Sequence, residues 1–177
     1  GILNGTTTFI LTKMIHDGMQ FDAALKLAQA LGLAERHPPA ELAGHDACRK
    51  ICILASLAFG KHVYPNQVET EGITNITLED VSYIENAGGV IKLLGQIKYI
   101  NDNEIAAFVS PAVVYNGSQL ASVKDVFNAI LVRGDAVGDV CFYGPGAGKL
   151  PTASAVVADI IDCAKHSERK KIFGWGA

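Results

Sequence analysis

The sequence predicts an α+β fold in which helices pack on one face of a largely antiparallel, mixed β-sheet. Apolar residues recur with helical spacing up to about residue 60, whereas β-branched and aromatic runs separated by turn residues dominate beyond Tyr64. Helices and strands do not alternate strictly, as they would in a βαβ protein. Because 49% of the 177 residues are hydrophobic, we expect a single domain over residues 1–177 with a substantial core.

Two helices are expected at the start of the chain. The first covers residues 2–19 and stops near Gly18, because glycine readily adopts the left-handed conformation that ends a helix. The second covers residues 23–31, with Asp22 as its N-cap and Gly32 after its end. Two short helices in succession favour a helical hairpin.

An ordered loop and a third helix follow. Residues 33–44 contain Pro38 and Pro39, which break the helical period, so this segment is expected to be a loop. Residues 45–59 carry a broad apolar helical face that Gly60 closes.

The second half of the chain is expected to consist mainly of strands. Thr77 is placed to cap a helix over residues 78–86, and Pro151 at the first helical position opens a helix over 152–166. A basic tail over residues 167–177 shows no clear pattern. The strands are predicted over residues 68–73, 90–100, 105–115, 127–133 and 139–143.

Composition and charge exclude some classes of function. The net charge is −3 and acidic and basic residues are interleaved, so no basic stripe is available for a nucleic-acid backbone. No long apolar span or signal peptide is present, which favours a cytoplasmic protein without membrane contact. The chain begins at Gly1 inside a patterned segment, so we expect further chain to precede it in the native protein.

The cysteines do not predict a metal site. Cys48 and Cys52 stand one helical turn apart, but no histidine or second cysteine pair lies nearby at zinc-ligand spacing. Cys141 and Cys163 have no paired spacing either, so we expect reduced thiols and no bound metal.

The most informative stretch for chemistry runs from the predicted loop into the third helix. Asp46 and Lys50 are four residues apart and therefore share a helix face, and Glu35 and Glu41 lie on the loop before it. A carboxylate beside a lysine can hold a substrate ammonium while the lysine transfers a proton. The alternative is a surface salt bridge, worth only about 0.3–0.5 kcal/mol.

A glycine-rich turn between a strand and a helix is the second candidate. Gly144, Gly146 and Gly148 would leave backbone amides open to an anion or a cofactor ring. The segment does not match a Walker phosphate loop, because Tyr143 and Leu150 occupy its key positions. The alternative is a tight turn that requires a positive φ.

The third candidate is the polar run over residues 4–8. Gly5 and Thr6 could face a ligand, but Asn4 and the following hydroxyl groups could equally cap a helix by bonding to its backbone.

Taken together, these motifs resemble the homoserine dehydrogenase family in order and spacing. The Gly-His-Asp-x-x-x-Lys block with its upstream Leu-Gly-Leu-Ala-Glu is close to that family's signature. The resemblance covers nearly all of residues 1–165. It is carried by residues 1–11, 32–50, 71–73, 91–94, 143–148 and 151–153.

The resemblance implies interconversion of homoserine and aspartate semialdehyde by hydride transfer with NAD(P), in the pathway to threonine, methionine and isoleucine. Lys50 is implied as the proton donor and Asp46 as the acid one turn before it, while Glu35 and Glu41 would hold the amino group of the substrate. Gly148 and Gly146 would contact the nicotinamide side of the cofactor, with Gly5 and Thr6 close to it.

The resemblance also implies a further domain outside this chain and a second subunit. The family carries its dinucleotide-binding βαβ domain before this segment, so NAD(P) would be bound mainly outside this chain, and residues 144–166 would pack towards that domain. A homodimer through the β-sheet is implied. Two departures are visible: Thr8 replaces a common Asn, and Glu41 replaces Asp, which lengthens that side chain by one methylene.

Two other hypotheses stay open at this point. The chain could serve only as a dimerisation module, or it could be a small-molecule-binding domain in which Asp46 and Lys50 form a simple salt bridge.

Overall fold

A computed structural model describes residues 1–102 and 104–168 as six α-helices and five strands, and most of the predicted tail lies outside the described residues. The helices are α1 (Gly5–Asp17), α2 (Phe21–Ala30), α3 (Pro39–Leu42), α4 (His45–Phe59), α5 (Leu78–Asn86) and α6 (Lys149–Lys165). The strands are β1 (Glu69–Thr70), β2 (Gly89–Asn101), β3 (Glu104–Tyr115), β4 (Phe127–Gly134) and β5 (Gly138–Pro145), and the short 3₁₀ helices are η1 (Pro65–Gln67) and η2 (Gln119–Ser122).

The strands form two sheets rather than one. β2 and β3 make a long antiparallel hairpin, and β1 adds a short parallel edge to β3, which gives the order β1-β3-β2. β4 and β5 form a separate antiparallel hairpin, joined to the N-terminus by the bridge between Ile2 and Ala129. The predicted α+β class with a mixed, largely antiparallel sheet is therefore confirmed, although the strand predicted over 68–73 shrinks to two residues.

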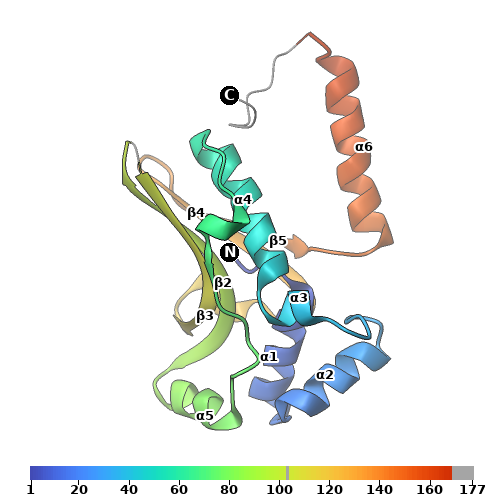
Figure 1. The fold of residues 1–177 in the computed structure, drawn as a ribbon, viewed down its shortest axis with the longest axis vertical. Coiled ribbons are helices and arrows are strands. Elements are labelled where there is room, and N and C mark those ends of the chain that lie inside the picture. Colours follow the sequence, from blue (N-terminus) through green and yellow to red (C-terminus); the bar gives the residue numbers. More distant parts are fainter. Residues whose placement is uncertain (103, 169–177) are drawn as a thin grey trace.

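The two faces of the β2–β3 hairpin pack against different elements. Ile91 and Leu93 point to one face and join the larger core. Figure 1 shows α1, α4 and α5 arranged along this hairpin. Leu94 and Val114 point to the other face and form a smaller core with η2 and the start of β4. The helices therefore cover one face of the main sheet, as predicted.

Most helix ends follow the sequence signals. Gly18 and Gly60 adopt left-handed conformations, with φ of 62° and 63°, at the ends of α1 and α4. The Thr77 side chain caps α5 by accepting from the Asp80 amide.

Two predicted caps are wrong, and the predicted loop contains a helical turn. α2 begins at Phe21 with Gln20 as N-cap, since Phe21 packs against the core, so Asp22 lies in the first turn instead. α6 begins at Lys149, so Pro151 is its third residue instead of its first. Proline fits there too, because the first backbone amides of a helix have no hydrogen-bond acceptor within the helix. The loop over residues 33–44 includes α3, which begins at Pro39.

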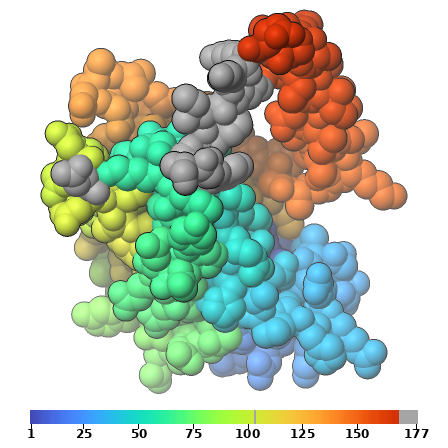
Figure 2. Space-filling view, turned by 45° about the horizontal axis from the view of Figure 1, so that its top comes forward, coloured from blue at the N-terminus to red at the C-terminus, as the bar shows by residue number. Residues whose placement is uncertain are grey.

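Helix α6 lies apart from the other elements. In the described part of the chain none of its residues is buried, and Leu150 and Ile160 are 82% and 61% exposed. Figures 1 and 2 show it projecting beyond the rest of the fold. None of the described helices has the length and apolar character needed to cross a lipid bilayer.

Candidate active site

Asp46 and Lys50 meet on the first two turns of α4. Lys50 Nζ donates a hydrogen bond to Asp46 Oδ2 at 2.8 Å. The Lys50 side chain is 44% exposed and the Asp46 side chain is 27% exposed. The helix starts after Gly44, whose φ of 83° suits glycine. A β-carbon added there would lie 3.1 Å from the Thr70 side chain and 3.2 Å from the Glu71 carbonyl oxygen. The predicted pairing on one helix face is therefore present.

Residues 3 and 4 hold this pair from the opposite side. Lys50 Nζ donates a second hydrogen bond to the Leu3 carbonyl at 2.9 Å, and Asn4 Nδ2 donates to Asp46 Oδ2 at 2.8 Å. The other end of the Asn4 amide, Oδ1, accepts from the Thr7 amide at 2.9 Å and caps α1. The capping alternative for residues 4–8 is thus confirmed for Asn4, but the same side chain also reaches Asp46.

The pKa of Asp46 reflects these contacts. Partial burial alone would raise it, but the hydrogen bonds from Lys50 and Asn4, together with the nearby charge of Arg49, hold the pKa of Asp46 below its usual value. Asp46 therefore stays ionised at neutral pH and remains an acceptor for the ammonium of Lys50.

Glu41 lies on α3 next to this pair. In the described part of the chain its Oε2 atom is buried and has no hydrogen-bond partner. Burial raises the pKa of Glu41, the charges of Asp46 and Glu35 raise it further, and Thr6 and Lys50 act in the opposite direction. A buried carboxylate oxygen without a donor is costly unless a ligand supplies one.

The backbone that carries Glu35 is held on both sides. Gln29 Nε2 donates to the carbonyls of Glu35 and Arg36 at 3.2 and 3.1 Å, and Thr6 Oγ1 donates to the Leu33 carbonyl at 2.8 Å. The Glu35 side chain itself is exposed, and its charge is felt at Glu41. The structure thus brings together Glu35, Glu41, Asp46 and Lys50, with Thr6 beside them.

The hairpin that leads into the glycine turn contacts the N-terminal segment. Ile2 forms a β-bridge with Ala129 on β4. Further along, Gly5 lies against Val126: a β-carbon added at Gly5 would be 3.3 Å from the Val126 carbonyl oxygen. Phe127 pairs with Pro145 at the end of β5, so the next position of the turn, Gly146, falls beside the same end of β4.

Gly146 and Gly148 differ in what their backbone requires. A β-carbon added at Gly146 would come within 2.0 Å of Asn128 Nδ2, so this position is held against the side chain of Asn128. Gly148 has a φ of 122° and caps the start of α6. The interpretation as a turn that requires a positive φ is therefore confirmed at Gly148. Gly5 and Gly146 both lie against residues at the start of β4.

Three positioning contacts were not found from the sequence. The Leu3 carbonyl is a backbone atom and gives no sequence signal, and the amide of Gln29 could have bonded to many neighbours. Asn4 gave a capping signal only, because its contact with Asp46 spans 42 residues of sequence.

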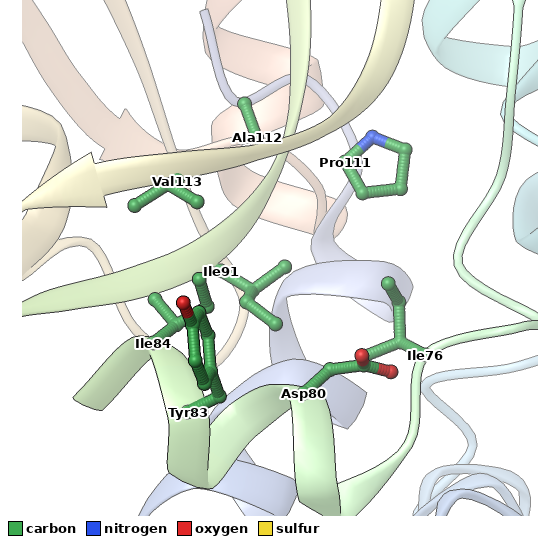
Figure 3. Close-up of a pocket in the computed structure, with 8 residues that line it drawn as sticks. All are labelled: Ile76, Asp80, Tyr83, Ile84, Ile91, Pro111, Ala112 and Val113. Carbon is green, nitrogen blue, oxygen red and sulfur yellow. The ribbon is translucent and has the colours of Figure 1, made fainter. Parts of the chain in front are cut away.

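Two hollows in the described part of the chain lie outside the group formed by Glu35, Glu41, Asp46 and Lys50. One lies between α5 and the β2–β3 hairpin, where Figure 3 shows Tyr83 and Ile84 facing Ile91 and Val113. The other lies beside α4 and is lined by His45, Cys48, Arg49, Pro65, Val68 and Thr70. No group of three or more His, Cys, Asp and Glu side chains stands ready to hold a metal ion among the residues the structure describes.

Comparison with known proteins decides the family. The family model for homoserine dehydrogenase matches residues 1–161. The chain belongs to the homoserine dehydrogenase family. The resemblance inferred from the sequence motifs is therefore confirmed.

Homoserine dehydrogenases of known sequence and structure align with most of this chain. The enzyme of Synechocystis is 47% identical over 165 residues, which is 92% of this chain and 38% of that protein, and the Bacillus subtilis enzyme is 44% identical over 166 residues, 94% and 38%. The crystal structure of a homoserine dehydrogenase from Thiobacillus denitrificans has a TM-score of 0.90 at 43% identity and covers 98% of this chain and 41% of that one. The chain thus spans about two fifths of the length of these relatives.

A more distant homoserine dehydrogenase structure contains a cofactor. A hyperthermophilic archaeal mutant enzyme in complex with NADPH has a TM-score of 0.75 at 32% identity, and covers 92% of this chain and 46% of that one. The fold described above is therefore shared across distant members of the family.

Proposed function

We propose that this chain supplies the substrate-binding and proton-transfer half of a homoserine dehydrogenase, which interconverts L-homoserine and L-aspartate 4-semialdehyde. Family membership supports the reaction, and the buried, unpartnered Oε2 of Glu41 next to the Asp46–Lys50 pair supports the substrate. The ammonium of homoserine would supply the missing donor, so that the charge of Glu41 and its hydrogen-bonding needs are both met. Glu35 would add negative charge on the exposed side of the same group.

Lys50 is proposed as the group that exchanges a proton with the substrate oxygen. In the oxidation of homoserine, the carbon that bears the hydroxyl group loses a hydride and the hydroxyl loses a proton, which an uncharged Lys50 Nζ would accept. In the reverse reaction the Lys50 ammonium would protonate the developing alkoxide, where a positive charge is most stabilising. Asp46 and the Leu3 carbonyl hold two of the three donor directions of the ammonium, which leaves one for the substrate.

NAD(P) would accept and return the hydride when bound. We propose that a nucleotide-binding domain outside this chain binds most of it, and that Gly146, Gly148, Gly5 and Thr6 lie on the nicotinamide side. The close approach of Gly146 to Asn128 and of Gly5 to Val126 fits this proposal, because a side chain at either position would fill the space beside the end of β4.

The surface of α6 supports an interdomain contact. We propose that residues 144–166 pack against the nucleotide-binding domain, since α6 has no buried residue and exposes Leu150, Val156 and Ile160. The relatives that match this chain contain the additional length that such a domain requires.

A homodimer through the sheet and a cytoplasmic location complete the proposal. β1 pairs with β3 only at Phe108 and Val109. Further along β3, Val113 and Tyr115 are 44% and 66% exposed, and an exposed apolar strand favours pairing with a second subunit. Sedimentation of the full-length enzyme should give a dimer, and a monomer at high micromolar concentration would contradict this part of the proposal. The four free cysteines are compatible with a reducing compartment.

The function is tested by comparing homoserine with 4-hydroxybutyrate, which lacks the amino group. The full-length enzyme should oxidise homoserine with NAD(P)+ and use the analogue at least about 100-fold less efficiently, because Glu41 would then keep an unpaired buried oxygen. Replacing Glu41→Gln should raise the KM for homoserine and reduce this discrimination. No oxidation of homoserine by the parent enzyme would overturn the proposed function.

A further inference from the structure

Asn4 is a buried residue that joins two structural elements. Asn4 is 5% exposed, and each end of its side-chain amide makes one hydrogen bond. Oδ1 accepts from the Thr7 amide and fixes the start of α1, while Nδ2 donates to Asp46 Oδ2 on α4 at 2.8 Å. The side chain thus connects the N-terminus of one helix to a carboxylate on another.

The same short segment also contacts Lys50. The Leu3 carbonyl, one residue before Asn4, accepts from Lys50 Nζ at 2.9 Å, and Lys50 donates to the same Asp46 oxygen that Asn4 contacts. Lys50 Nζ, Asp46 Oδ2 and the Asn4 amide therefore form a closed arrangement with the backbone of residues 3 and 4. If the amide donor of Asn4 were lost, Asp46 could rotate and follow the flexible lysine instead of holding it.

We propose that Asn4 is a positioning residue for proton transfer: its amide group locks the Asp46 carboxylate so that the Lys50 ammonium is held at a fixed place facing the substrate. The proposal rests on the proposed function, because it needs Lys50 to exchange a proton with the substrate. Asn4 itself makes no contact with the substrate in this account. Its loss should therefore lower kcat and leave KM for homoserine nearly unchanged.

The two tasks of Asn4 can be separated by substitution. Serine and aspartate are both good N-caps, so Asn4→Ser and Asn4→Asp should preserve the start of α1. Neither residue donates an amide hydrogen to Asp46, and aspartate adds a second negative charge beside it. In the full-length enzyme we expect kcat to fall about tenfold for Asn4→Ser, as for one lost charge-assisted hydrogen bond, and further for Asn4→Asp.

The pH dependence supplies a readout that a purely structural role would not move. The charged and titratable groups around Asp46 are Lys50 and Arg49 from α4 and Glu41 from α3. Removing the Asn4 donor should raise the pKa of Asp46, and a carboxylate in its place should raise it further, because a second negative charge disfavours the ionised form. In the reduction of aspartate semialdehyde, where ionised Asp46 must hold the Lys50 ammonium, the acid limb of the kcat profile should shift to higher pH in the same order. ¹³C NMR should show the same order for the Asp46 carboxyl group.

A matched control comes from another helix cap. Thr77→Ala removes the cap of α5 and should lower the melting temperature without moving the acid limb. A double-mutant cycle completes the test, since Asn4→Ser should have no further effect on kcat once Asp46→Ala has removed its partner.

The outcomes separate this proposal from the proposed function. If the parent enzyme oxidises homoserine but folded Asn4→Ser and Asn4→Asp variants keep its kcat and pH profile, the positioning role is wrong while the function stands. The positioning role would also be wrong if Asn4→Ser lowered kcat as much in the Asp46→Ala variant as in the parent enzyme, because Asn4 would then act through α1 and not through Asp46. An inactive parent enzyme would instead refute the function itself.

Discussion

Two ion pairs in this chain have nearly the same local geometry but different surroundings. Lys13 and Asp17 on α1 and Asp46 and Lys50 on α4 are both four residues apart, with N–O distances of 2.9 and 2.8 Å. Lys13 and Asp17 are 26% and 42% exposed, and Lys50 and Asp46 are 44% and 27% exposed, so both pairs are partly exposed to solvent. Neither spacing nor exposure distinguishes a surface salt bridge from a candidate catalytic pair.

What differs is the set of groups around each pair. Lys13 Nζ lies 5.6 Å from the ring centroid of Phe9, which belongs to its own helix. Asp46 and Lys50 instead contact Asn4 and the Leu3 carbonyl from a distant part of the sequence. Glu41, with its buried Oε2 atom, lies beside them. The charge of the distant Asp125 also acts on Lys13. Among the described residues, long-range hydrogen bonds reach only the second pair, and they mark it as part of a site.

The largest difference between the pairs is expected in turnover. Lys50→Ala in the full-length enzyme should lower kcat for homoserine oxidation by roughly 10²–10⁴-fold, because proton transfer would lose its acceptor. Lys13→Ala removes a lysine with a similar salt bridge and should leave kcat within about twofold of the parent. Steady-state kinetics of the two variants measures this difference. Similar kcat values for Lys50→Ala and Lys13→Ala would show that the two ion pairs do not differ in function.

The second prediction concerns the packing that holds α3 and Glu41 beside α4. A β-carbon on Gly72 would come within 1.9 Å of the Leu42 carbonyl oxygen and 2.5 Å of the Ala43 α-carbon, so Gly72→Ala must displace α3. We expect a loss of about 1–3 kcal/mol in the free energy of unfolding, together with a raised KM for homoserine.

Gly117→Ala is the matched control for that change. A β-carbon there would meet nothing within 4 Å, and the position does not have a positive φ. Urea denaturation should find this variant close to the parent. Equal stability of the two alanine variants would show that α3 tolerates displacement and does not hold Glu41 firmly.

The third and smallest effect is the acid dependence of stability. Because the folded pKa of Asp46 lies below the ordinary value of 3.8, the unfolded chain binds a proton at higher pH than the folded chain does. The stabilisation by ionised Asp46 is thus complete above the unfolded pKa and is lost as pH falls through the folded one. Asp46→Asn should flatten the fall of the urea midpoint below about pH 5, whereas Lys13→Ala should retain it.

The sequence predicted elements better than long-range contacts. Helical spacing located α1 and α4, and the capping signal of Thr77 located α5. The glycines at residues 18 and 60 ended helices because only local backbone conformation was involved. The cap of α2 was wrong because burial of Phe21, a tertiary effect, set the start of that helix. The division into two sheets likewise depends on long-range strand pairing, since β4 pairs with β5 and not with β3, and no local pattern reveals this.

The candidate site shows the same division. Spacing and family motifs singled out Glu35, Glu41, Asp46 and Lys50, and the structure brings them together. The double role of Asn4 could not be predicted, because a capping residue is recognised from its neighbours and its second partner is 42 residues away.

A crystal structure of the full-length enzyme with homoserine and oxidised cofactor tests the account most directly. The substrate hydroxyl should lie about 2.6–3.2 Å from Lys50 Nζ, with the ammonium group of homoserine against Glu41. Homoserine bound instead in the hollow lined by His45 and Arg49, with Lys50 paired only to Asp46, would contradict it.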